Sequence, residues 1–189
     1  MTGVQTCALP ILLEWCQRAG IARAMRDVWE DWEDWFRMLA DTHSVSPMLT
    51  MSPSVQRNQS WVLAAAAVLD AATLATCSIE TGDAEAARIC VRTGTRAFLA
   101  IADALRRSWP ATEHGSVCPS RQEYEAARAR LHSAGIQLRS ESDLEAQWKE
   151  FQLLRGQYEE TLSFVARQTF VPLNGGLVDL RKDEAHQSQ

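Results

Sequence analysis

Lysine is scarce in this 189-residue chain, and arginine supplies nearly all of its positive charge. The arginines are spread among acidic residues rather than clustered, and the formal net charge is −5. Nucleic-acid binding requires clustered lysine and arginine side chains that neutralise phosphates. The charge pattern therefore argues against a nucleic-acid partner.

The sequence also lacks the motifs of common catalytic and metal-binding sites. No two of its four histidines lie one helical turn apart, and none of its five cysteines falls in a C-x-x-C pair. It has no G-x-S-x-G, Walker A or G-x-G-x-x-G pattern. We therefore expect no catalytic residue, no cofactor and no metal site, and we expect that the protein is not an enzyme.

Period-two alternation and strand-sized β-branched runs are missing, so the apolar residues must be organised differently. In the first half of the chain they recur at spacings of 4, 3, 4, 3 and 4, and Trp29 and Phe36 widen that stripe. A widened heptad stripe is typical of a helix in a bundle. The pattern predicts an all-α bundle of about five helices, with a long Pro-containing loop over His43–Gln59 and a frayed C-terminal tail.

The most apolar run extends from Trp61 to Ile79 and nearly reaches the length of a membrane span. Asp70 lies at its centre, and a central Asp costs roughly 2.5–3.5 kcal/mol on membrane-insertion scales. We therefore expect a buried core helix instead of a membrane span. A buried Asp70 needs a partner, and Arg92 and Arg96 on the following helix are the candidates.

That following helix is expected over Ala84–Arg107, after a C-terminal cap at Gly82 and an N-terminal cap at Asp83. Gly94 in its middle costs roughly 1 kcal/mol relative to Ala. A close approach of the Ala-rich helix would offset that cost.

Two S-x-x-E capping boxes predict the starts of the last two helices, at Ser120–Glu123 and Ser142–Glu145. The final helix is expected to continue through apolar positions near heptad spacing: Leu144, Trp148, Phe151, Tyr158, Leu162 and Val165. This stripe and the earlier one over Ile21–Leu39 are candidates for self-association or for internal core.

Seven residues form the candidate interaction or packing face. They are Trp29, Trp32, Trp35, Phe36, Trp61, Asp70 and Trp148. Core packing is the favoured interpretation of the Trp-rich stripe, and an aromatic ligand pocket is the alternative. The acids around it, Glu30 and Asp34 among them, are interpreted as a solvated helix face and not as a catalytic carboxylate pair.

The first residues differ in character from the rest of the chain. Residues 2–11 resemble the translation of a sequencing adapter, and they lack the basic start of a signal peptide. We therefore interpret residues 1–11 as an artefact, residues 12–170 as a helical cytosolic domain and residues 171–189 as a flexible tail. In this interpretation the natural protein continues upstream of Leu12.

Three stretches together resemble the cytosolic region after the pore of bacterial potassium-channel-like membrane proteins, which carry the two-transmembrane ion-channel module. The stretches are Leu12-Leu13 with Ala19–Ile21 and then Trp29–Phe36, Thr42–Ser44 with Pro47, and Ser60–Ala72. The later pattern also fits, at Ala87–Gly94, at Tyr124–Ala127 with Ala134–Leu138, and at Trp148 with Phe151 and Tyr158. The resemblance covers roughly Leu12 to Val165. The chain departs from the family because it contains no selectivity-filter signature and no pore helix.

The resemblance implies a non-catalytic cytosolic domain with a regulatory or assembly role, in a protein of the bacterial inner membrane. Its implied partners are the missing N-terminal pore segment of the same protein and further copies of the chain in a homo-oligomer. A free-standing all-α module that binds a ligand or a protein is the alternative, and an enzyme of unknown type comes third.

Overall fold

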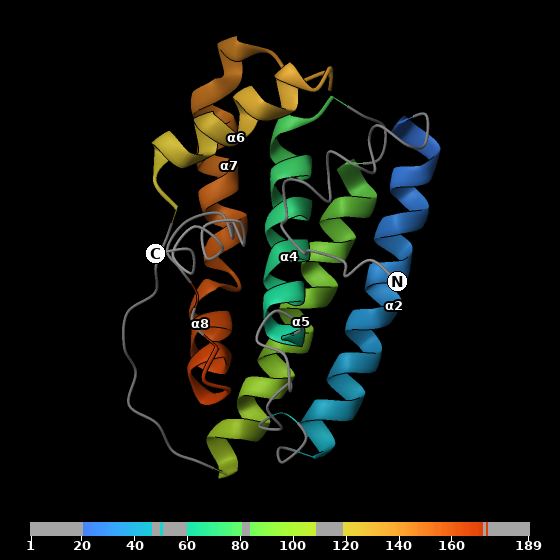
Figure 1. The fold of residues 1–189 in the computed structure, drawn as a ribbon, viewed down its shortest axis with the longest axis vertical. Coiled ribbons are helices and arrows are strands. Elements are labelled where there is room, and N and C mark those ends of the chain that lie inside the picture. The colour runs from blue at the N-terminus through green and yellow to red at the C-terminus, as the bar shows by residue number, and fades with distance from the viewer. Residues whose placement is uncertain are drawn as a thin grey trace, which may run out of the picture.

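The computed structural model describes residues 21–46, 50, 60–80, 84–108, 119–171 and 173 (Figure 1). The described part contains six α-helices, one 3₁₀ turn and no strand. The elements are α2 (Ile21–Val45), α4 (Trp61–Ser78), α5 (Ala84–Ser108), α6 (Arg121–Ser133), the turn η2 (Glu141–Asp143), α7 (Leu144–Gly156) and α8 (Glu159–Gln168). The predicted all-α bundle is confirmed.

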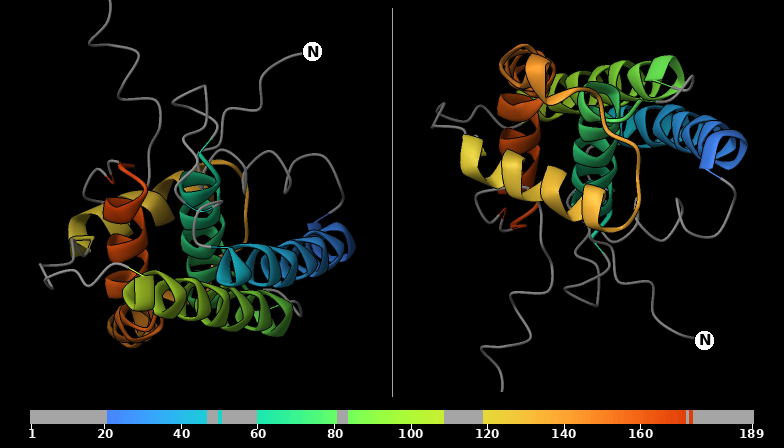
Figure 2. Two further views of the ribbon diagram at one scale, coloured as in Figure 1. Left: turned by 90° about the horizontal axis from the view of Figure 1, so that it is seen from below. Right: turned by 90° about the horizontal axis from the view of Figure 1, so that it is seen from above.

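Helix α4 runs through the middle of the bundle, and the other helices surround it (Figures 1 and 2). Helix α5 packs along α4, and α2 packs mainly on α5 at one edge of the molecule. Helices α7 and α8 follow one another along the opposite side of α4, and α6 crosses one end. Helices α2 and α5 run in the same direction, and α4 runs against both.

The composition of α4 follows from its central position. Sixteen of its 18 residues are buried, including Val62, Leu69 and Leu74. By length and composition alone α4 could cross a membrane, but it is mostly buried inside the protein. The predicted buried core helix is confirmed.

The two heptad stripes both lie in the core. On α2, Met25, Trp29, Phe36 and Leu39 are buried, and Val28, Trp32 and Trp35 are partly buried. Glu30, Asp31 and Asp34 face outward, whereas Glu33 is only 7% exposed. On α7 and α8 the stripe contributes further buried side chains, namely Trp148, Phe151, Tyr158, Leu162 and Val165. Of the two interpretations left open for these stripes, internal core is the one that the structure supports.

Gly94 marks the closest approach of three helices. A Cβ atom at Gly94 would lie 2.7 Å from Leu69 Cδ2 on α4 and 2.9 Å from Phe36 Cε2 on α2. Gly94 itself is on α5. The predicted close approach is confirmed, with α2 as an additional neighbour.

The predicted helix ends agree with the structure at one capping box and disagree at the other. Ser120 Oγ accepts a hydrogen bond from Glu123 N, and Ser120 N donates to Glu123 Oε2. The box at Ser142 is wrong, because Ser142 lies in the 3₁₀ turn, where its N–H donates to Ser140 Oγ. Helix α7 begins only at Leu144.

Two other predicted boundaries also change. The last helix is not continuous, because α7 ends at Gly156 and α8 begins at Glu159. The loop predicted from His43 onward begins later, because α2 continues to Val45. The predictions for Pro47, for Gly82 and Asp83, and for residues 1–11 and 174–189 lie outside the described residues.

A short backbone link joins the end of α4 to the segment between α6 and α7. Ile79 and Leu138 form an isolated antiparallel bridge, with Arg139 N donating to Ser78 O at 2.9 Å. Gly135 has a φ of +82°, which favours glycine, and it turns the chain from α6 into this link. These backbone hydrogen bonds therefore hold the end of α4 against the segment that precedes α7.

Candidate functional site

Asp70 is a carboxylate with no exposed surface at the centre of the apolar helix α4. Arg155 Nη1 on α7 donates a hydrogen bond to Asp70 Oδ1, and Tyr158 Oη donates to the same oxygen at 2.9 Å. The predicted partners of Asp70 are therefore wrong. Arg92 and Arg96 are exposed, because their positions on α5 face away from α4.

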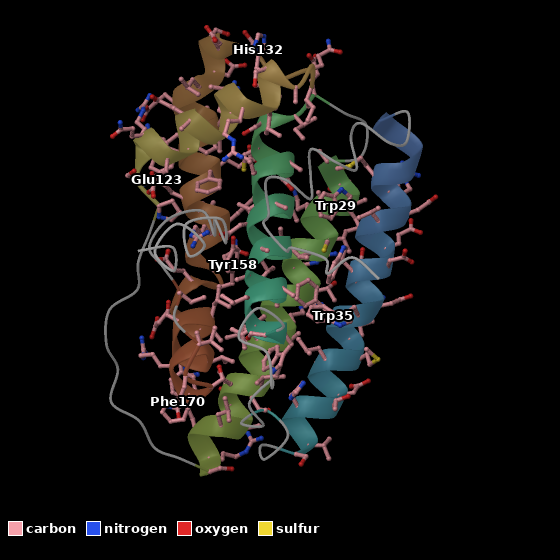
Figure 3. The ribbon with its side chains drawn as sticks, in the orientation of Figure 1. Trp29, Trp35, Glu123, His132, Tyr158 and Phe170 are labelled. Carbon is pink, nitrogen blue, oxygen red and sulfur yellow. The ribbon has the colours of Figure 1, made fainter. Side chains whose placement is uncertain are left out.

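The charged groups around Asp70 extend along the break between α7 and α8. Arg155 and Glu159 are 5% and 4% exposed, and Arg155 Nε lies 4.0 Å from Glu159 Oε2. Tyr158, between them, points from the α7–α8 column toward the middle of the bundle (Figure 3). We call Asp70, Arg155, Tyr158 and Glu159 the buried charge cluster.

The surroundings of Arg155 and Tyr158 hold these two side chains in fixed protonation states. Burial by itself lowers the pKa of Arg155, but the Asp70 carboxylate outweighs that effect and raises it above its ordinary value. Burial raises the pKa of Tyr158 well above its ordinary value, and the nearby Asp70 carboxylate adds to the increase. Arg155 therefore stays charged and Tyr158 stays a hydrogen-bond donor near neutral pH.

The geometry makes the cluster a clamp between helices. Arg155 is near the end of α7, and Tyr158 comes directly before α8, so the two donors lie on either side of the break and share one acceptor. Glu159 begins α8, where a negative charge is favourable. Removing one partner of a buried ion pair costs roughly 3–5 kcal/mol. The cluster therefore fixes the position of α7 and α8 against α4.

A second polar network lies at the other end of α7 and is more exposed. Arg139 Nη1 donates to Cys77 O at 3.2 Å and to Glu150 Oε2 at 3.0 Å, and Arg88 Nη2 donates to Glu150 Oε1 at 2.8 Å. Arg128 reaches Gln147 in the same region. These bonds join α4, α5, α6 and α7 near the backbone link, and they serve helix packing.

The seven residues of the candidate face occupy separate parts of the molecule. Trp29 and Phe36 are fully buried, and Trp32 and Trp35 are half-buried with their rings 5.1 Å apart in a T-shaped arrangement. Asp70 belongs to the buried charge cluster. Trp148 stacks on Phe151 beneath α6, and Trp61 lies at the start of α4, next to His43.

His43 connects the end of α2 with the start of α4. Its ring stacks on Trp61 at 4.6 Å, and its Nδ1 lies 3.1 Å from Thr50 Oγ1. Thr50 Oγ1 also donates to His43 O at 3.3 Å, and the direction of the bond between Nδ1 and Oγ1 depends on the tautomer of the ring. Burial lowers the pKa of His43, and we therefore assign it the neutral form.

Sequence reasoning missed Arg155, although a signal for it existed. Residues 148, 151, 155, 158, 162 and 165 are spaced at 3, 4, 3, 4 and 3, and all lie on the buried stripe. An arginine at one of these core positions indicates a buried acid opposite it.

Within the described residues, no group of three or more His, Cys, Asp or Glu side chains could hold a metal ion. Comparisons with known proteins add no assignment, because no protein-family model, no curated protein and no solved structure matches this chain.

Proposed function

We propose that this chain is a non-catalytic helical domain with a regulatory or assembly role, attached to the pore of a potassium-channel-like membrane protein. The observation that carries the proposal is the buried charge cluster. Its ionisable side chains are at most 6% exposed and join α4 to α7 and α8. Groups used in this way stabilise an arrangement of helices and do not present a reactive atom to a substrate.

The stretches that carry the family resemblance support the same proposal. Trp29–Phe36 lies on α2, and Trp61–Ala72 forms the first two-thirds of α4. The buried residues of both stretches, among them Trp29, Phe36 and Leu69, lie in the shared core of α2, α4 and α5. A domain can bias the gating of a pore only if its packing differs between the open and closed states. We assign this role to the buried charge cluster, because it fixes α7 and α8 against α4.

The first experiment is to recover the uninterrupted gene by long-read sequencing and to measure rubidium uptake into vesicles that contain its product. We expect two membrane spans and a filter sequence upstream of Leu12. We also expect that Arg155→Met, but not Arg130→Met at an exposed position on α6, changes the fraction of open channels. An intact gene without a pore would refute the channel assignment.

The alternative function is a free-standing module that binds a ligand or a protein partner. It is favoured by Trp32 and Trp35, which are half-buried beside one another on α2 and offer aromatic surface. The same intact gene separates the two proposals, since a binding module would be encoded without membrane spans.

A further inference from the structure

Two outward-facing ridges of opposite charge lie on parallel helices of this chain. The acidic ridge on α2 has the heptad spacing of a helix–helix seam, and its members are Asp27, Asp31, Asp34, Met38, Asp41 and Val45. The basic ridge on α5 consists of Arg88, Arg92, Arg96 and Leu99. All of these residues are exposed.

Each ridge places like charges one helical turn apart, which weakens a helix. Two members already have partners inside the chain, because Asp34 pairs with Arg37 at 2.5 Å and Arg88 pairs with Glu150 at 2.8 Å. On α5, Arg92 has Arg88 and Arg96 as its neighbours at four residues, and neither Arg92 nor Arg96 has an acid three or four residues away. Among the described residues, no acidic side chain forms an ion pair with either of these two arginines. An external acidic partner would remove this repulsion.

We infer that the basic ridge of one chain binds the acidic ridge of a second copy, so that the protein assembles through α5 and α2. This inference deepens the assembly role proposed above and rests on it. The two ridges match when the helices are parallel. With Arg92 beside Asp31, Arg88 lies beside Asp27, Arg96 lies near Asp34, and Leu99 meets Met38.

The exposed apolar residues support this register. Met38 is 58% exposed and Leu99 is 42% exposed, so each ridge offers one apolar side chain directly after its run of charges. The register also places Asp41 near Asp103, which is unfavourable. However, Asp103 already pairs with Arg106 at 3.4 Å, which reduces the repulsion.

The direction of the helices determines the kind of assembly. Because α2 and α5 run the same way within one chain, a rotation about an axis along the helices makes α2 of one copy parallel to α5 of the next (Figures 1 and 2). Such a contact joins two different surfaces of the chain. Repeated from copy to copy, it gives a closed ring when the rotation between neighbouring copies divides a full turn into a whole number of steps. A ring around the axis of a pore has this symmetry.

The test measures the mass of the full 189-residue chain by sedimentation velocity at low and high salt. We expect oligomers at low salt that dissociate at high salt, because exposed charge pairs are screened within roughly 10 Å at 0.1 M. We expect the Arg92→Glu/Arg96→Glu variant and the Asp31→Lys/Asp34→Lys variant to associate at least about tenfold more weakly. An equimolar mixture of the two should associate again, because each then offers the ridge that the other lacks.

The control matched to Arg92→Glu/Arg96→Glu is Arg130→Glu/Lys149→Glu, which makes the same change in net charge at exposed positions on α6 and α7 and should associate as the unmodified chain does. Circular dichroism verifies that each variant is folded. A chain that stays monomeric at low salt, a reversed ridge that still associates, or a mixture that stays monomeric would overturn the inference. The outcome is independent of the channel assignment, because an intact gene without a pore would leave this association unchanged.

Discussion

Leu69 and Asp70 are consecutive residues on α4 that meet their neighbours in different ways. Leu69 faces Gly94 and Phe36, where the missing Cβ of a glycine allows α2, α4 and α5 to approach closely. Asp70 faces the opposite column, where Arg155 and Tyr158 bond to its carboxylate. Since successive helix residues point about 100° apart, one helix can present a shape-matched side and a charge-matched side.

The two sides of α4 differ in how much stability the protein loses when a residue on them is substituted. Apolar contacts lose stability in proportion to the atoms removed or added. A buried ion pair responds abruptly, because removal of one partner leaves the other charge buried without compensation. We therefore expect substitutions on the Asp70 side to have larger effects than substitutions on the Leu69 side.

The largest effect is expected for Arg155→Met, which leaves the Asp70 carboxylate buried without its cation. We expect the free energy of unfolding to fall by about 3–5 kcal/mol, measured by urea denaturation. Arg88→Met is the control, because Arg88 pairs with Glu150 at the surface and exposed pairs contribute about 0–1 kcal/mol. Equal losses of unfolding free energy for Arg155→Met and Arg88→Met would mean that the buried pair contributes no more to stability than the exposed pair.

A double variant sharpens the same point. Asp70→Leu combined with Arg155→Met replaces the pair with apolar groups, which is often neutral or stabilising for buried ion pairs. We expect the double variant to be more stable than Arg155→Met alone. Additive losses in a double-mutant cycle would show that Asp70 and Arg155 are not coupled.

The next effect concerns two buried cysteines, Cys77 on α4 and Cys90 on α5, whose reactivity measures how well the core around α4 is closed to solvent. Burial raises the pKa of Cys77, near Glu150 and Arg139, and of Cys90, near Glu33, to about 12. The thiolate fraction at pH 8 is then about a thousandfold lower than for a thiol of pKa 9. We expect Ellman's reagent to label either thiol at least about a thousandfold more slowly in the folded chain than in urea.

The labelling is measured after Cys7, Cys16 and Cys118 are changed to serine, with one reporter cysteine retained at a time. The same pKa shifts predict that stability is full below pH 9 and falls as the pH rises toward 12, because the unfolded state loses its thiol protons first. Rapid labelling of both thiols at pH 8 without denaturant would contradict the burial that both sides of α4 require.

A smaller effect is expected on the shape-matched side. Gly94→Ala places a methyl group against Leu69 and Phe36, and overpacking costs about 1–3 kcal/mol, reduced by about 1 kcal/mol of improved helix propensity. We expect a net loss of up to about 2 kcal/mol in urea denaturation. Gly156→Ala is the control, because nothing lies within 4 Å of its added Cβ, and it should be neutral or slightly stabilising. A gain of stability for both Gly94→Ala and Gly156→Ala would show that the three helices leave room for a methyl group at Gly94.

The smallest effects are expected at two helix starts that touch neither side of α4. Ser120→Ala removes the cap of α6 and should cost about 1 kcal/mol. Ser142→Ala should cost less than about 0.5 kcal/mol, because the capping box predicted there does not form. Thermal unfolding of the two variants measures this difference. A larger loss for Ser142→Ala would indicate that its hydroxyl has a different role.

The shape-matched side could be predicted from sequence because its signals are local or periodic. The heptad stripe of α2, the Ala-rich run of α4 and the mid-helix Gly94 each indicate close packing without knowledge of distant residues. The need of Asp70 for a partner was also predictable. Its identity was not, because the candidates on the next helix, Arg92 and Arg96, face outward, and Arg155 lies 85 residues away from Asp70.

The break between α7 and α8 was missed for a related reason. No proline interrupts the stripe there, and Gly156 alone does not predict a helix end. The two helices separate where Arg155 and Tyr158 must both reach one carboxylate, so tertiary contacts override the local pattern. Local propensity is a weak prior in such places.

The 85 residues between Asp70 and Arg155 have a consequence for synthesis on the ribosome. Chains are made at about 5–20 residues per second, so Arg155 is added about 4–17 s after Asp70. Throughout that interval Asp70 has no cation to pair with, and the side of α4 that carries it stays exposed to solvent. The final order of the helices is set only when the last third of the chain has been translated.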